Sequence, residues 1–453
     1  MTNHEHNSRR KFLKNVLVAG GATAIGGLGG LGTLSSLARG AGEEERFYVF
    51  VYFAGGWDIL MSLDPRDPGV FTNENVGVTR IMPGYDVLGI DEPLQDRSGI
   101  RFGPFIGELG ALASDLCVIR GMSMDTLTHE VGRRRFITGK SPSGLLARGS
   151  AGSAWLASAF GGNEPIPNLS IRVESFNPDL PSWASALRVS NSSDLVAMLR
   201  RADPLLGEEL DLEVNALLED EALCPRSRHA PLLREADSSR RRVRTLIERD
   251  LQSLFDFRAS TPEMEALRDR YGIGNDFNGA EAQAAVAAQA LASGVCRCVT
   301  IQGAGGLDTH FNDWETDQGP RQQRGFNAVA RLVRHLKELP FRDTGESLFD
   351  RTTIVGFSEF MRTPMINARG GRDHWLTNSC FLIGGNIQGG QVIGASTDTG
   401  MAPGLTNFES GQPDPGGQVI YPEHILRTLL VDAGIENDAA DLRVDGLPAL
   451  LRT

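Results

Sequence analysis

Strand-like and helix-like stretches alternate along the C-terminal half of the chain, and this order restricts the fold more than any other feature. Residues 295–303 and 352–357 are short runs of β-branched and apolar side chains, typical of buried strands. Helix patterns occupy residues 321–340 and 422–434. Because strands joined through helices run parallel and have both faces covered, the sequence predicts an α/β fold with a mostly parallel central sheet and helices on both faces.

The same pattern starts near the N-terminus, where residues 46–53 predict a first strand and residues 115–121 a second. Residues 193–293 have a mostly helical pattern, with apolar side chains at i, i+3 and i+4. No repeat divides the sequence into similar units. We therefore expect one domain over residues 41–453, with a helical insertion at about 193–293.

Residues 1–40 have the pattern of an export signal. Arg9 and Arg10 precede a Gly- and Ala-rich apolar run, which is typical of a twin-arginine signal peptide. The run is rich in glycine and is interrupted by Arg39, so it is a poor membrane span. We expect the twin-arginine export machinery to carry the protein to the periplasm, the cell surface or the medium. Cleavage after Gly40 would leave no stable membrane span; an uncleaved N-terminal anchor is the alternative.

The charge and the cysteines exclude several classes of protein. Of 45 Lys and Arg and 57 Asp and Glu, residues 1–40 hold five and one, which leaves 40 and 56 and a net charge of −16. Such a charge repels phosphate backbones, so we do not expect a nucleic acid partner. The five cysteines are odd in number and lack a CxxC pair, which favours buried thiols over a disulfide scaffold or a zinc ribbon.

Acids and histidines follow the predicted strands. Ligands bind at the carboxyl ends of parallel strands, which meet at one edge of the sheet. Carboxylates and imidazoles that converge there suit one or two divalent metal ions, and this ligand set favours Zn or Mn. His129 follows the second predicted strand at the same edge. The candidate metal ligands are Asp58, Asp308, His310, Glu359, Asp373 and His374.

Four of these candidates also have a purely structural interpretation. Asp308 and His310 could form an Asp-turn with a hydrogen-bonded histidine, although residues at i and i+2 can also present both side chains to one ion. Glu359 could be an acid at a helix N-terminus, and Asp58 a turn residue after two glycines. His335 lies within an amphipathic helix pattern and is expected to be an ordinary residue of a helix face.

Four segments together resemble one protein family. They are FAGGWDILMSLDP at 53–65, LDTHFN at 307–312, SEFMRTPMINARGGRDHW at 358–375 and PEHILRTLLVDAG at 422–434. The chain resembles the bacterial, twin-arginine-exported domain-of-unknown-function family numbered 1501, which is similar in fold to the alkaline phosphatase and sulfatase superfamily. The resemblance implies an α/β sandwich that holds one or two metals between strand ends and hydrolyses phosphate or sulfate esters.

The resemblance also implies individual roles. Asp58, Asp308, His310, Glu359 and His374 match metal ligands, with Asp373 beside the last of them. Phe360 stands where sulfatases have a further ligand, which leaves that position empty.

The nucleophile departs from the sulfatase pattern. Sulfatases carry C/S-x-P-S-R followed by Leu-Thr-Gly-Arg, and here the segment 138–140 matches the end of that pattern. Counting back nine positions from Thr138 places His129 where the nucleophile would be and Arg133 at the arginine, which would hold the anionic group. Thr128 is the adjacent alternative and Ser62 a further one.

Two functions are therefore expected. The first is an exported metal-dependent hydrolase that acts on a small anionic phosphate or sulfate ester or on a glycan, with water activated by the metal as the nucleophile. The second is a non-catalytic metal-containing surface or binding protein that keeps the fold without the consensus nucleophile.

Overall fold

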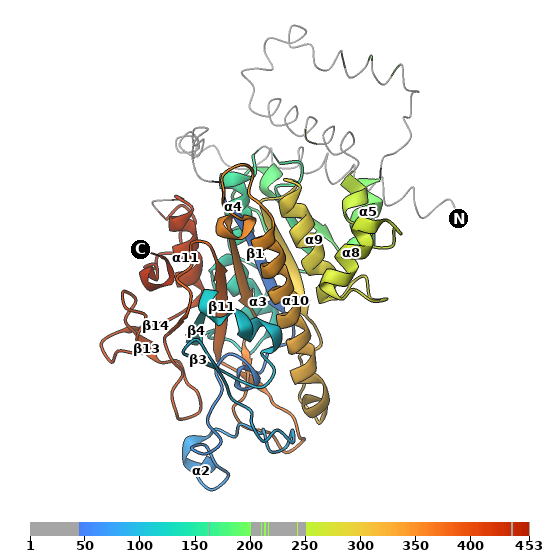
Figure 1. Ribbon diagram of the computed structural model, residues 1–453. Coiled ribbons are helices and arrows are strands. Elements are labelled where there is room, and N and C mark those ends of the chain that lie inside the picture. Colours follow the sequence, from blue (N-terminus) through green and yellow to red (C-terminus); the bar gives the residue numbers. More distant parts are fainter. Residues whose placement is uncertain are drawn as a thin grey trace.

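An eight-stranded sheet forms the centre of the protein (Figure 1). The computed structural model describes residues 45–162, 164–200, 251–435 and 438–452, and between 201 and 250 only Leu210, Glu213, Ala216 and Arg242. The strand order is β12-β4-β11-β8-β1-β7-β5-β6. The strands are β1 (Phe47–Phe53), β4 (Leu116–Ser123), β5 (Asn168–Ile171), β6 (Leu187–Val189), β7 (Cys298–Ala304), β8 (Thr352–Phe357), β11 (Thr377–Gly384) and β12 (Gln391–Ile393).

The predicted mostly parallel sheet is confirmed. Of the eight strands that the structure describes in this sheet, β11 runs antiparallel to its neighbours β4 and β8, and all other neighbours are parallel. Most strands therefore end at one edge. The chain passes from β8 to β11 through a small hairpin of β9 (Met361–Arg362) and β10 (His374–Trp375), which lies at this edge.

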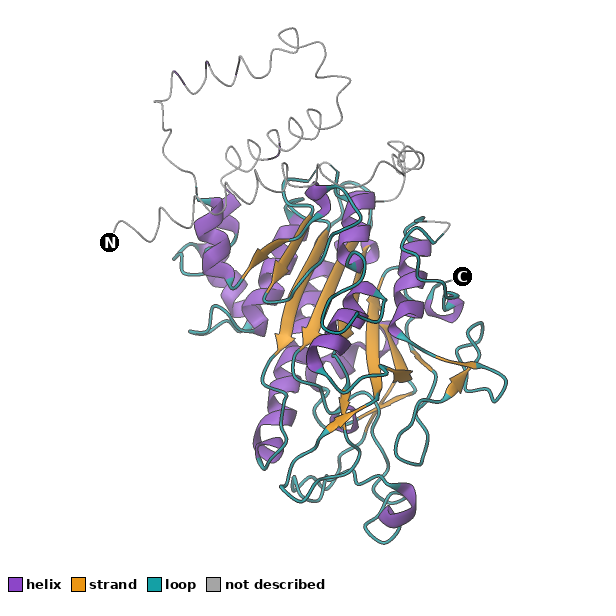
Figure 2. Ribbon diagram, turned by 180° about the vertical axis from the view of Figure 1, so that it is seen from behind, coloured by secondary structure: helices purple, strands orange, loops and turns teal. Residues whose placement is uncertain are grey.

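Helices cover both faces of the sheet, as predicted (Figures 1 and 2). Alternate residues of β1 enter two separate cores, with Val49 and Val51 in one and Tyr48 and Phe50 in the other. The first core includes α8 (Pro262–Tyr271), α9 (Ala280–Ala292) and α10 (Gly319–Glu338). The second includes α3 (His129–Thr138), α4 (Gly152–Phe160) and α11 (Pro422–Asp432). Both faces of β1 are buried, which explains why its sequence is continuously apolar rather than alternating.

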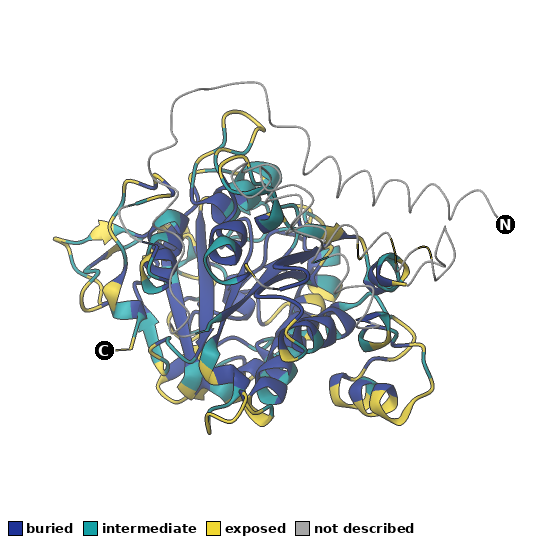
Figure 3. Cartoon of the chain, turned by 90° about the horizontal axis from the view of Figure 1, so that it is seen from above, coloured by how far each residue is buried: buried dark blue, intermediate teal, exposed yellow. Residues whose placement is uncertain are grey.

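Exposed residues lie mainly at the rim of the molecule (Figure 3). Shorter helices and strands surround the core. They are α2 (Val76–Thr79), α5 (Ser192–Leu199), β2 (Gln95–Arg97), β3 (Ile100–Phe102), β13 (Leu405–Thr406), β14 (Gln418–Val419), the 3-10 helices Ile59–Met61, Gly107–Asp115, Ser182–Ala184, Leu251–Leu254, Leu348–Arg351 and Pro448–Leu450, and a π-helical turn at Trp314–Gln318.

The signal segment and part of the expected insertion lie outside the described residues. Within 193–293, the described helices include α5, α8 and α9, and α9 packs on α10 and β7 as part of the helical layer. Four of the five cysteines are buried free thiols, as expected, and Cys224 lies outside the described residues. Among the helices that the structure describes, none is both long and apolar enough to cross a membrane.

His335 gives a testable link between burial and pH. It lies on α10 with 9% of its surface exposed, and its Nδ1 is 3.0 Å from the Tyr271 hydroxyl. Burial lowers the pKa of His335 to about 4. An unfolded histidine has a pKa near ~6.5. Between pH ~6.5 and about 4, the unfolded state therefore binds a proton that the folded state does not. Stability that is fully present above pH ~6.5 is therefore lost as the pH falls toward 4, by up to about 1.4 kcal/mol per unit.

We expect His335→Gln to flatten this part of the curve of unfolding free energy against pH, measured by urea unfolding. An equal slope in the variant and the wild type would assign the dependence to other groups.

Candidate metal centre

The predicted strand-end residues reach one edge of the sheet from three parts of the chain. Asp308 and His310 follow β7, and His129 is the first residue of α3, after β4. His374 is the first residue of β10 and pairs with Arg362 of β9, so the hairpin returns it toward the end of β8. An isolated bridge between Phe311 and Gly370 joins the hairpin loop to the loop after β7.

Three side chains lie close enough to hold one metal ion. The ligand atoms of His129, Asp308 and His374 are all within 4.8 Å of one another. Asp308 Oδ1 is 3.3 Å from His129 Nε2 and 3.2 Å from His374 Nε2. Ligands that surround a Zn²⁺ ion tetrahedrally at ~2.0 Å are about 3.3 Å apart, so these separations match those of metal ligands.

His310 borders the same space. Its Nε2 is 3.0 Å from Asp308 Oδ1 and 3.0 Å from His374 Nε2. The site can therefore offer three imidazole nitrogens and one carboxylate oxygen, a ligand set that suits Zn²⁺ or Mn²⁺ better than thiophilic metals. His129, which the sulfatase pattern placed at the nucleophile, lies instead among the candidate ligands.

The hydrogen bonds at Nδ1 determine where each ring carries its proton. His129 Nδ1 is 2.7 Å from Glu359 Oε1, and His310 Nδ1 is 2.8 Å from Asp373 Oδ1. His374 Nδ1 is 2.7 Å from the carbonyl oxygen of Leu127. Because a carboxylate or a carbonyl only accepts, each Nδ1 must donate. In the neutral rings, all three Nε2 atoms then carry lone pairs.

These lone pairs face one another and a carboxylate oxygen. Nε2 of His129 is buried and forms no hydrogen bond with the described residues, although it contacts Asp308 Oδ1. Arg362 donates to Asp308 Oδ1 and His310 Nε2, but no described residue donates to Nε2 of His129. Such a group of facing acceptors is unfavourable unless a cation, either a proton or a metal ion, occupies the space between them. The residues present therefore fit a divalent metal.

Two acids orient histidines and do not face the centre themselves. Glu359 is buried, and its oxygens also accept from the Gly55 N–H at 2.9 Å and from the Ser358 hydroxyl at 2.8 Å. Gly132 allows α3 to pack closely against the backbone of Glu359, because a Cβ at position 132 would lie 2.3 Å from the Glu359 carbonyl oxygen. Asp373 accepts from His310 and lies 3.3 Å from Arg369 Nη2. Such partners commonly support metal-binding histidines.

The electrostatics of the cluster follow from burial and from neighbouring charges. Burial by itself would raise the pKa of Asp308, but the hydrogen bond and charge of Arg362 lower it overall. Burial would also raise the pKa of Glu359, and the hydrogen bond from His129 reverses this. Burial lowers the pKa of His374, whereas Glu359 and Asp308 together raise the pKa of His129 despite its burial. Both carboxylates are therefore ionised at neutral pH and available to a cation.

Asp58 is not brought into this cluster. Its side chain is fully buried, and its Oδ2 lies 2.8 Å from Trp314 Nε1 and 3.0 Å from Arg372 Nε. Its Oδ1 accepts from the backbone N–H of Leu60 at the start of a 3-10 helix. Both oxygens are occupied by protein donors, so the carboxylate serves as a buried ion-pair partner rather than as a candidate ligand.

The predicted catalytic residues have different surroundings. Arg133 is paired with Glu174, whose Oε1 is 2.9 Å from Nε, and it also lies over the Tyr52 ring. Ser62 is buried and donates to the Asp58 carbonyl. Thr128 is exposed beside His129, and within the described residues its hydroxyl forms no hydrogen bond that caps α3. Of these three, Thr128 is the one with an accessible side chain next to the cluster.

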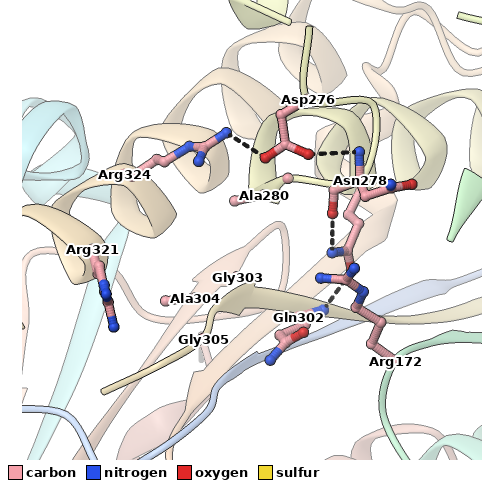
Figure 4. Close-up of a pocket in the computed structure, with 12 residues that line it drawn as sticks. Arg172, Asp276, Asn278, Ala280, Gln302, Gly303, Ala304, Gly305, Arg321 and Arg324 are labelled. Carbon is pink, nitrogen blue, oxygen red and sulfur yellow. Dashed lines mark hydrogen bonds and ion pairs between the residues drawn. The ribbon is translucent and has the colours of Figure 1, made fainter. Parts of the chain in front are cut away.

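A hollow of about 290 Å³ lies apart from these residues, at the ends of β5 and β7 (Figure 4). Arg172, Arg321 and Arg324 contribute to its lining, but Arg324 is paired with Asp276 and Glu281. Arg321 is paired with Asp317. The hollow includes none of the predicted site residues.

A family model described as "Protein of unknown function (DUF1501)" matches residues 46–410. No curated protein matches the chain. Solved structures that match include Ps i-CgsB in complex with k-i-k-neocarrahexaose, at 10% identity and a TM-score of 0.37, over 90% of this chain and 76% of that one.

Another solved structure comes from a study of glycosaminoglycan metabolism by Bacteroides thetaiotaomicron. It is 10% identical, with a TM-score of 0.35, over 89% of this chain and 76% of that one. At these TM-scores the site has to be interpreted from the chain's own residues.

The surroundings of Asp58 lead to a stability prediction. Asp58→Asn removes the charge that faces the fully buried Arg372, and breaking such a pair should lower the free energy of unfolding by about 3 kcal/mol. The folded variant should keep the wild-type affinity for Zn²⁺, because Asp58 faces away from the cluster. Urea unfolding and calorimetric titration measure the two quantities.

The double variant Asp58→Asn/Arg372→Met removes both charges and should recover part of the lost stability. A loss of Zn²⁺ affinity of about tenfold or more in the folded single variant would instead connect Asp58 to the metal.

Proposed function

Because residues 46–410 match its model, the chain belongs to the family described as "Protein of unknown function (DUF1501)", and we propose that it is a metal-dependent hydrolase of phosphate or sulfate esters. The twin-arginine pattern of residues 1–40 supports export by the twin-arginine machinery to the periplasm, the cell surface or the medium. The proposed substrate is a small anionic ester, free or carried on a glycan.

One observation carries the proposal. The Nδ1 atoms of His129, His310 and His374 are all committed to acceptors, and their Nε2 atoms gather around Asp308 Oδ1. This arrangement is the one expected of histidines prepared for a metal ion, because the partner at Nδ1 selects the ring nitrogen that binds. We propose that His129, His374 and Asp308 hold the ion and that His310 completes the set.

The bound ion would supply Lewis-acid chemistry, which polarises an ester oxygen and makes water a stronger nucleophile near neutral pH. The chain's own residues would position the reactants. Glu359 and Asp373 keep the protons of His129 and His310 at Nδ1. The first backbone N–H groups of α3 lie beside the cluster, since the helix starts at His129, and they favour an anionic group there.

A second function is supported by a different observation. Arg133, expected to hold the anionic group, is instead paired with Glu174, and His129 occupies the nucleophile's place as a candidate ligand. Both features suit a non-catalytic surface or binding protein that keeps a metal in the same fold. Thr128 and water remain as nucleophiles for the hydrolase.

Removing a ligand should weaken metal binding. We expect His129→Ala or His374→Ala to lower the affinity for Zn²⁺ or Mn²⁺ by more than about 100-fold, because each removes a nitrogen that no neighbour replaces. The matched control is His335→Ala, in the last turn of α10 and hydrogen-bonded to Tyr271, which should keep the wild-type affinity. Calorimetric titration of chelator-treated protein provides the measurement, and equal affinities in all four proteins would contradict the proposed site.

Turnover separates the two functions. The metal-loaded protein should hydrolyse a generic aryl phosphate or aryl sulfate, and chelation should abolish the activity and lower the melting temperature, because an ion bound to the folded state stabilises it. A melting temperature that responds to chelation without any turnover would favour the binding protein. If neither the activity nor the melting temperature changes on chelation, the metal centre is excluded.

A further inference from the structure

Arg362 is a fully buried charge directly behind the candidate metal ligands. Its side chain has 0% exposure, and each of its N–H groups has an acceptor. Nε donates to the Gly56 carbonyl at 3.0 Å, and Nη1 donates to the Arg372 carbonyl at 3.2 Å and to His310 Nε2 at 3.4 Å. Nη2 donates to the Gly55 carbonyl and, at 2.6 Å, to Asp308 Oδ1.

Two of these acceptors are atoms that face the metal site. The guanidinium contacts Asp308 Oδ1 and His310 Nε2 from the buried side. Asp308 Oδ1 lies within 3.3 Å of all three imidazole Nε2 atoms, and His310 Nε2 is 3.0 Å from His374 Nε2. The chain therefore already places one permanent positive charge against the ligand cluster. Since arginine is not deprotonated in proteins, this charge persists at any working pH.

Of the other acids at this edge, Glu359 and Asp58 have both side-chain oxygens engaged by protein donors. Both oxygens of Glu359 accept hydrogen bonds, from Gly55 and His129 at Oε1 and from Ser358 at Oε2. Asp58 is likewise occupied at both oxygens. A second ion bound to Asp308 Oδ1 and His310 Nε2 would lie where the guanidinium already donates to both atoms, and its charge would be repelled there.

We propose that the Arg362 guanidinium stands in the place of a second cation, so that the centre takes one divalent ion and not two. The proposal rests on the metal centre of the proposed function and specifies it further. Arg362 is a positioning residue: it holds the half-exposed Asp308 in place and touches neither solvent nor substrate. It also gives a role to an arginine in the 358–375 segment that no ligand assignment requires.

The metal content of the folded wild-type protein is the primary test. After saturation with Zn²⁺ or Mn²⁺ and removal of excess ion by gel filtration, we expect elemental analysis and calorimetric titration to give one ion per chain. Two ions per chain would overturn this inference and leave the hydrolase intact. No bound ion would overturn the hydrolase proposal itself.

Variants at position 362 test the charge. Arg362→Lys keeps a cation and should bind one ion with an affinity within about tenfold of the wild type, whereas Arg362→Met should lose about 10- to 100-fold in affinity. The matched control is Arg66→Met, since Arg66 is also buried but is bonded to Asp64 and Ser396, and it should keep the wild-type affinity.

Unchanged affinity and stoichiometry in a folded Arg362→Met variant would overturn the inference. If that variant fails to fold, the number of ions bound per chain by the wild type and by Arg362→Lys still tests the inference. Two ions in either protein would contradict the role assigned to Arg362.

Discussion

The buried guanidinium of Arg362 is the interaction on which the candidate centre depends. It joins the loop after β1, through the Gly55 and Gly56 carbonyls, to the loop after β7, through Asp308. Strand ends leave backbone carbonyls without partners, and in a buried edge each such carbonyl needs a donor. Arg362 provides these donors from one side chain, so the loop after β1 and the loop after β7 that carries Asp308 and His310 are held relative to one another by hydrogen bonds rather than by apolar packing alone.

The polar composition of residues 358–375 follows from the same requirement. Arg372, ten positions after Arg362, is also fully buried and donates to the Thr363, Met82 and Pro83 carbonyls. A buried charge is tolerated only when it is paired and hydrogen-bonded, and Asp58 is the counter-charge. A stretch that resembles a surface loop in its composition is therefore an internal scaffold. Its two buried arginines, Arg362 and Arg372, are structural, and its histidine, His374, faces the site.

The sheet could be predicted because burial on both faces makes each parallel strand a continuous apolar run, and the rule for strand ends then selected one edge. That rule brought Asp308, His310 and His374 into one place. It could not separate ligands from ion-pair partners, because the donors to Asp58 are Trp314 and Arg372, both distant in sequence.

His129 shows the same difficulty in reverse. Aligning residues 129–140 with a sulfatase pattern assigned it to the nucleophile, whereas its place after β4 already indicated the shared edge. Its role as a candidate ligand depends on Glu359, which is hydrogen-bonded to it across 230 positions. Only the folded backbone reveals which acid a histidine meets, just as the pairing of Arg133 with Glu174 appears only in three dimensions.

The layering of the centre bears on whether it acts on a substrate. The groups behind the ligands, Glu359 and Arg362, are almost completely buried, whereas the Asp308 side chain is 50% exposed. Structural metal sites are usually closed by protein ligands on all sides, while catalytic sites keep one side open to water or substrate. Here the buried layer constrains the histidines and the open side lies toward solvent, next to exposed Thr128. An ion held in the proposed centre would therefore be accessible from the open side, and an anion there would have to rely on groups other than Arg133, which is paired with Glu174.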